Sequence, residues 1–237
     1  MNIKKEDNTH KITLIGGYTD KEGATHRDIN FGKRLKVKNL IDLDQNPQAR
    51  IPAQREMMLV ASSITAFGKL KMPISLMTIF ELDSIDIDDL QAGHDEFLQI
   101  TRQSKKGEVV SETQTRLSFG VERDGVNYNL VTFGRRLSFK DRVEAQRKGL
   151  FGVANMLSET VAQIEKITNE ETGLELIAPF ETELFCNLDL EDFDTLFAGG
   201  ELWRQSFRRS GEAAPGERNE AESVNADDAS RNEQAGS

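Results

Sequence analysis

The sequence predicts an α+β protein of two tandem modules, each an N-terminal β-hairpin followed by a small helical bundle. Three observations predict it: a segment of the chain repeats, each copy alternates polar and apolar residues around a turn, and each alternation is followed by apolar residues at helical spacing. The predicted modules cover residues 8–103 and 112–209. Residues 210–237 are predicted to form a disordered acidic tail.

The repeat appears when residue n is aligned with residue n+102. Residues 23–41 then lie over residues 125–143 without a gap. The clearest shared stretch reads Phe-Gly-Lys-Arg-Leu from Phe31 in the first copy and Phe-Gly-Arg-Arg-Leu from Phe133 in the second. Both halves keep the same order of elements, which favours a duplication over chance similarity.

A hairpin is predicted at the start of each copy. Residues 115–121 and 126–133 alternate polar and apolar side chains, and residues 122–125 supply turn chemistry that ends in glycine. Residues 11–31 show the same pattern in the first copy. The glycine after each strand-ending phenylalanine is expected to bend the chain.

Helices are expected after each hairpin. The apolar spacing predicts one over residues 52–67, with Gly68 as its C-cap, and a longer one over residues 150–167. A later helix is predicted to be N-capped by Asp86 in the first copy and by Asp189 in the second, each followed by acidic residues in its first turn. This assignment places residues 85–90 over residues 188–193, now at a spacing of 103.

Composition narrows the class of protein. The chain has 237 residues, 37% of them hydrophobic, and a net charge of -10. No apolar run approaches the ~20 residues that cross a bilayer, and the N-terminus lacks the apolar core of a signal peptide, so a cytosolic protein without a membrane partner is expected. Cys186 is the one cysteine and cannot form an internal disulfide.

The last 28 residues, 210–237, contain seven acidic residues and two arginines, and Val224 is their one apolar residue larger than alanine. Such a segment cannot bury enough surface to offset its ordering entropy. A solvating tail is favoured over an acidic interaction arm.

No standard catalytic motif is present. The chain lacks a phosphate-binding loop, a nucleophile elbow and a His-Glu-x-x-His pair. His10, His26 and His94 have no second ligand at metal-binding spacing, and Cys186 lies among apolar residues as a small core side chain. We therefore expect a non-enzymatic protein with no cofactor and no metal.

Basic residues after each hairpin form the best candidate for a partner-binding face. The candidate residues, with the aromatic residue that precedes each cluster, are Phe31, Lys33, Arg34, Lys36, Lys38, Phe133, Arg135, Arg136 and Lys140. Nucleic acid is disfavoured as the partner, because aromatic side chains are not interleaved with the cluster and the protein is acidic. An acidic protein partner and a plain solvated edge both stay open.

Three stretches of the first module, residues 31–41, 54–68 and 73–98, resemble tail assembly chaperones of tailed bacteriophages. The similar features are a basic-apolar strand leading into a helix, an Ile-Thr-x-x-Gly pattern from Ile64, a Leu-Asp pair at Leu82, and a closing segment that ends in Phe97-Leu98. The second module keeps this order but lacks the middle patterns.

The resemblance implies a non-enzymatic assembly factor in the host cytoplasm, absent from the mature virion, that binds the tape-measure protein and tail-tube subunits. Two modules on one chain would raise the effective concentration for a repetitive client. Met57, Met58, Met72 and Met77 are candidates for an adaptable groove, with core packing favoured for most of them. A structural accessory protein of the tail or head that is retained in the virion is the main alternative, and a nucleic-acid-binding regulator is a second. Self-association into a homo-oligomer stays open.

Overall fold

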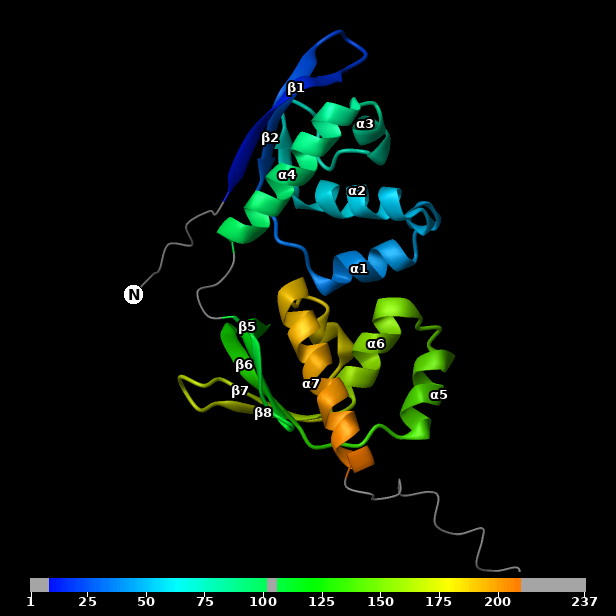
Figure 1. Ribbon diagram of the computed structural model, residues 1–237. Helices are drawn as coiled ribbons and strands as arrows, with labels where there is room; N and C mark the ends of the chain where they lie inside the picture. Colours follow the sequence, from blue (N-terminus) through cyan, green and yellow to red (C-terminus); the bar gives the residue numbers. More distant parts are fainter. Residues whose placement is uncertain (1–8, 102–105, 210–237) are drawn as a thin grey trace, which may run out of the picture.

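The computed structural model describes residues 9–101 and 106–209. This part of the chain is mixed α+β, with seven α-helices and two antiparallel sheets (Figure 1). The predicted tail, residues 210–237, and the predicted module limits at residues 8 and 103 lie outside the described residues. None of the helices in the described ranges combines the length and the apolar composition needed to cross a bilayer.

The N-terminal half is built on a three-stranded sheet. Strands β1 (His10–Thr19), β2 (Thr25–Phe31) and β3 (Ile64–Phe67) pair in that order. The helices are α1 (Val37–Asp44), α2 (Pro52–Ser63), α3 (Leu76–Phe80) and α4 (Ser84–Ile100), with a 3-10 turn at Pro47–Arg50. Helices α2 and α4 pack with the sheet around a core that includes the fully buried Phe31, Phe67, Leu90 and Phe97.

The C-terminal half is also built on an antiparallel sheet that helices cover. Its sheet has five strands in sequence order: β4 (Glu108–Ser111), β5 (Gln114–Arg123), β6 (Val126–Phe133), β7 (Ile164–Thr168) and β8 (Glu175–Ile177). The helices are α5 (Phe139–Arg147), α6 (Gly152–Val161) and α7 (Leu190–Arg209), with a 3-10 turn at Thr182–Phe185. Phe133, Leu157, Ile164 and Leu196 lie in the second core.

One buried carboxylate holds a bulged strand in each sheet, β1 in the first and β5 in the second. Asp86 in α4 and Asp192 in α7 are fully buried. Each accepts hydrogen bonds from three consecutive backbone N–H groups, at 2.5–3.1 Å: Ile15, Gly16 and Gly17 in β1, and Ser118, Phe119 and Gly120 in β5. The pairing register shifts at these segments, so each carboxylate satisfies donors that a β-bulge removes from the ladder.

The two predicted long helices are each too long. Helix α2 ends at Ser63 and α6 ends at Val161, and the following apolar residues form the strands β3 and β7. Ile64 pairs with Phe31, and Ile164 pairs with Phe133. Apolar residues three positions apart are compatible with a short strand as well as with a helix. Here each segment forms a strand because it pairs with the free edge of the hairpin. Each hairpin is therefore part of a sheet that the helices cover.

The predicted cap at Asp86 is wrong. Asp83 is the N-cap of α4, and its Oδ1 accepts the N–H groups of Ile85 and Asp86. Asp189 immediately precedes α7 and accepts the N–H of Glu191 at 3.2 Å, as a capping residue does. Asp86 and Asp192 make the same kind of contact from the closing helix of each half, α4 and α7, and lie 106 residues apart, whereas the sequence alignment has a spacing of 103 residues.

Helix α1 belongs to the first half in sequence and packs between α2 of that half and α6 of the second half (Figure 1). Val37, at its first position, is fully buried in the second core. The backbone just before and at its start pairs with the segment before α7: Val37 N donates to Leu188 O, Lys38 N donates to Cys186 O, and Leu190 N donates to Leu35 O, at 2.9–3.2 Å. The two halves are thus joined by a short antiparallel pairing and by shared core residues.

Candidate partner-binding surface

The structure divides the predicted partner-binding residues into three groups. Phe31 and Phe133 form the first, because both are at most 1% exposed and lie in the two cores. Each ends the second strand of its hairpin and packs beneath the closing helix. These rings stabilise the fold and present no surface to a partner in this conformation.

Arg34 and Lys36 form the second group, at the junction of the two halves. The Arg34 guanidinium makes a bidentate ion pair with the buried Asp189, at 2.6 and 2.8 Å, and its Cζ lies 4.1 Å from the centre of the Phe119 ring. It also donates to the Thr101 carbonyl oxygen. Burial opposes its charged form, but the hydrogen bonds and the attraction of Asp189 raise the pKa of Arg34 above its ordinary value.

The third group is exposed. Lys33, Lys38, Arg135, Arg136 and Lys140 all present their side chains to solvent. Arg136 is nevertheless held in place, because its Cζ lies 4.1 Å from the centre of the Phe207 ring on α7. Three of these five residues, Arg135, Arg136 and Lys140, lie at or just before α5 and form one basic face of the C-terminal half. A basic docking face therefore stays a prediction for the five exposed residues, three of which lie at or just before α5.

Two of the histidines, His26 and His94, have structural partners. His26 Nδ1 accepts the Lys69 N–H at 3.2 Å, so its Nε2 carries the proton that is donated to Asp20 Oδ2 at 2.8 Å. The hydrogen bond from His26 holds the pKa of Asp20 below its usual value. His94 is buried and hydrogen-bonded to Ser63 Oγ at 3.1 Å. Both His26 nitrogens are occupied, which leaves none to transfer a proton to a substrate.

Metal or thiol chemistry has no assembled site in the described ranges. No group of three or more His, Cys, Asp or Glu side chains is arranged there to hold a metal ion. Cys186 is half-buried against the second core, and burial raises the pKa of its thiol, which lowers its reactivity.

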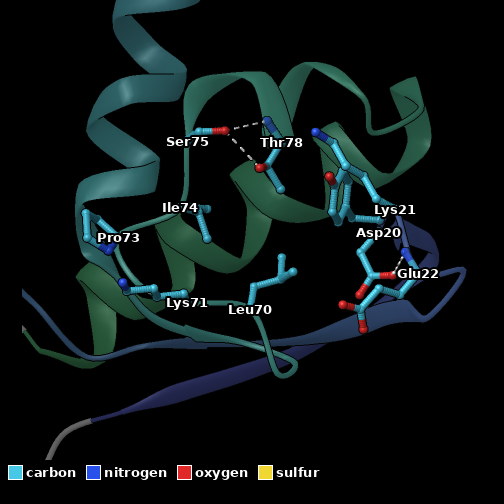
Figure 2. Close-up of a pocket in the computed structure, with 10 residues that line it drawn as sticks. Asp20, Lys21, Glu22, Leu70, Lys71, Pro73, Ile74, Ser75 and Thr78 are labelled. Atoms are coloured by element: carbon cyan, nitrogen blue, oxygen red, sulfur yellow. Dashed lines mark hydrogen bonds between the residues drawn. The ribbon is translucent and has the colours of Figure 1, made fainter.

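The hollows of the described surface differ in lining. Figure 2 shows one of about 400 Å³ between the β1–β2 turn and residues 70–78, lined by Asp20, Lys21 and Lys71 among other residues. Ser75 and Thr78 line it too, but they hydrogen-bond to each other as the cap of α3. A second open hollow, of about 440 Å³, lies along β2 and β3. Neither brings a nucleophile together with a base.

A smaller hollow, of about 250 Å³, lies between α1, α2 and residues 73–76. Its lining combines apolar Met58, Ile74 and Leu76 with polar Asn39 and Asp42. This volume is below the usual range for a metabolite site and suits one or two protein side chains. The other three methionines proposed for a groove lie outside this hollow: Met57 is in the core, Met72 packs against the core, and Met77 is exposed.

Comparisons with known proteins give no relative: no family model matches the chain, and neither a curated protein nor a solved structure matches it. The fold and the surface must therefore be interpreted from the residues themselves.

Proposed function

We propose that the chain consists of two copies of one module, each a bent hairpin, a third strand and a closing helix. The support is a set of equivalent contacts. The buried carboxylates of Asp86 and Asp192 hold the bulges, and Gly17 and Gly120 adopt positive φ within them. After each hairpin, two consecutive N–H groups donate to one carbonyl: Gly32 and Lys33 to Ser63, and Gly134 and Arg135 to Gln163.

We further propose that the protein is a non-enzymatic phage tail assembly chaperone, which binds the tape-measure protein and tail-tube subunits in the host cytoplasm and leaves before the virion matures. One observation carries this proposal: the residues of the resemblance occupy positions that define the fold. Ile64 and Phe97 are in the core, Gly68 adopts positive φ after β3, and Leu82 is buried before the α4 cap. The family pattern is thus consistent with this module's architecture.

The client site that the geometry supports best is the hollow between α1 and α2. A tape-measure helix exposes apolar side chains until the tube encloses it, and a chaperone needs a small apolar hollow with a polar rim to cover them. Met58 supplies an adaptable surface in that hollow. The amide and carboxylate side chains at the rim of the hollow can form hydrogen bonds with the client backbone while the rim stays partly hydrated.

The test is co-purification of the full chain with a helical segment of the tape-measure protein encoded in the same genome. We expect Met58→Glu to weaken this binding at least about tenfold, because it places a charge in the hollow. Leu174→Glu is the matched control, since Leu174 is half exposed on a distant turn. Equal binding by both variants would remove this hollow as the client site.

Virion content separates the proposal from its structural alternative. A chaperone is present in infected cells and absent from purified particles. Stoichiometric presence in particles would contradict the proposal and support an accessory protein of the virion. Binding to DNA that weakens steeply with salt would instead support the nucleic-acid alternative.

A further inference from the structure

The two equivalent helices α1 and α5 differ in the burial of their first residue. Each follows the repeated Phe-Gly-basic-Arg-Leu segment, and Val37 and Phe139 hold the same position at their starts. Val37 is fully buried in the second half, whereas Phe139 is 81% exposed. A large aromatic side chain at the start of an amphipathic segment is the kind of group that a partner covers.

The surface that receives α1 also has an equivalent. The backbone at the start of α1 docks on residues 186–190, where Asp189 binds Arg34 and the carbonyls of Cys186 and Leu188 accept backbone N–H groups, and the rest of the helix packs against α6. The spacing of 106 residues places the corresponding surface of the first half at residues 80–84, around Asp83. Asp83 is exposed, and its capping of α4 is compatible with binding an arginine, because Asp189 does both.

The residues around Asp83 suit the side chain of Phe139, which is larger than that of Val37. Phe80 and Ile85 are 43% and 56% exposed, and Ile15, beside the bulge that Asp83 approaches, is 67% exposed. Each of these apolar side chains is exposed enough to contact a partner. Phe119, which Arg34 covers, corresponds to Gly16, so this surface offers aliphatic contacts in place of an aromatic platform.

Charge favours the same pairing. The donor face carries Arg135, Arg136 and Lys140, and the receiving face carries Glu81, Asp83 and Asp88, all of them exposed. Arg136 rests on Phe207, the residue equivalent to Thr101, whose carbonyl oxygen accepts from Arg34. Each arginine therefore contacts its own closing helix at an equivalent position.

We propose that copies of this chain associate head to tail, with α5 of one copy docking on residues 80–85 of the next as α1 docks on residues 186–190 within the chain. Helix α5 and α3 lie at opposite ends of the described molecule (Figure 1). The contact is heterologous, so each copy keeps one donor and one receiving surface, and association continues until a ring closes or a filament grows. This inference rests on the proposed duplication of the module and does not depend on the proposed chaperone role.

Sedimentation velocity of the full chain over about a hundredfold range of concentration tests the proposal. We expect species larger than a monomer at the upper end. Phe139→Asp removes the donor and Ile85→Asp removes the receiving surface, and each is expected to weaken association at least about tenfold. Both positions are exposed, so each variant should retain the circular dichroism spectrum and unfolding midpoint of the parent.

Mixing the two variants gives the sharpest result. Phe139→Asp retains a receiving surface and Ile85→Asp retains a donor, so the mixture should form a dimer of one copy of each and nothing larger. Leu174→Asp, at an exposed apolar position outside both surfaces, should assemble as the parent does. A parent chain that stays monomeric throughout, single variants that still assemble, or a mixture that stays monomeric would each overturn the proposal. Client binding by a monomeric variant would leave the proposed function intact.

Discussion

A single buried carboxylate satisfies three backbone donors in each bulge. For Asp86, the donors are the N–H groups of Ile15, Gly16 and Gly17. Asp86→Ala leaves them partly buried without an acceptor, and we expect it to lower the free energy of unfolding by about 3–5 kcal/mol. Asp88→Ala, an exposed change on the same helix, should alter it by less than about 0.5 kcal/mol. Urea unfolding of both variants measures the difference, and similar losses would refute this role of Asp86.

His94 makes stability depend on pH. Burial lowers the pKa of His94, with the nearby Asp95 acting weakly in the opposite direction. The folded protein therefore holds this proton less tightly than the unfolded chain, so the free energy of unfolding should fall as the pH drops below about 6.5. The fall continues until the pH has passed the lowered pKa.

The variant His94→Gln, which keeps a polar group near Ser63, should flatten this dependence between about pH 7 and pH 5. Denaturant unfolding across that range measures the two slopes, and NMR titration of the His94 ring measures the pKa directly. Identical slopes in the two proteins, or a ring that titrates at its ordinary value, would contradict the prediction.

At the scale of the elements, the bulge of β1 needs glycine at position 17 for two separate reasons, the backbone conformation and the lack of space for a side chain. Gly17, in the bulge, and Gly23, in the turn between β1 and β2, both have positive φ, at 76° and 82°. A Cβ at Gly17 would clash with the carbonyl oxygen of His26, whereas a Cβ at Gly23 meets nothing within 4 Å. We expect Gly23→Ala to cost about 1–2 kcal/mol for backbone conformation alone, and Gly17→Ala to cost about 1–3 kcal/mol more. Thermal unfolding of both variants checks this, and equal losses would show that the clash relaxes.

The elements also show where sequence reasoning succeeds. The hairpins follow from alternation and turn residues, which are local signals. The strands β3 and β7 do not, because the spacing of Ile64 and Phe67, or of Ile164 and Ile167, fits a helix until the edge of the hairpin is known. Likewise, Asp86 has the sequence signature of a cap, and its role as an acceptor for β1 depends on a contact across about seventy residues.

The candidate site was predictable in part for a similar reason. Sequence identified the basic residues after each hairpin, but equivalent residues in a repeat need not have equivalent surroundings. Arg34 faces the second half and pairs with the buried Asp189, whereas Arg136 follows β6 and remains exposed. This difference depends on what each arginine meets in the folded chain, and no local sequence pattern records it.

For the whole molecule, the junction should behave as an interface between two bodies that the chain also connects. Arg34 and Asp189 are 17% and 3% exposed, so the pair is largely desolvated, and removing one partner leaves a buried charge uncompensated. The paired backbone and the buried Val37 add contacts that do not depend on charge. The two halves should therefore stay together after the connection between them is cut.

A site-specific protease sequence inserted after residue 103 tests this. The cleaved parent protein should elute from a size-exclusion column as one complex, because α1 remains docked on the second half. Arg34→Ala should weaken the complex by roughly 3 kcal/mol, or about a hundredfold in dissociation constant. Lys38→Ala should leave it unchanged, since that side chain is exposed and only its backbone N–H takes part. Separation of the parent fragments at micromolar concentration would show that the connecting chain, and not the junction, holds the halves together.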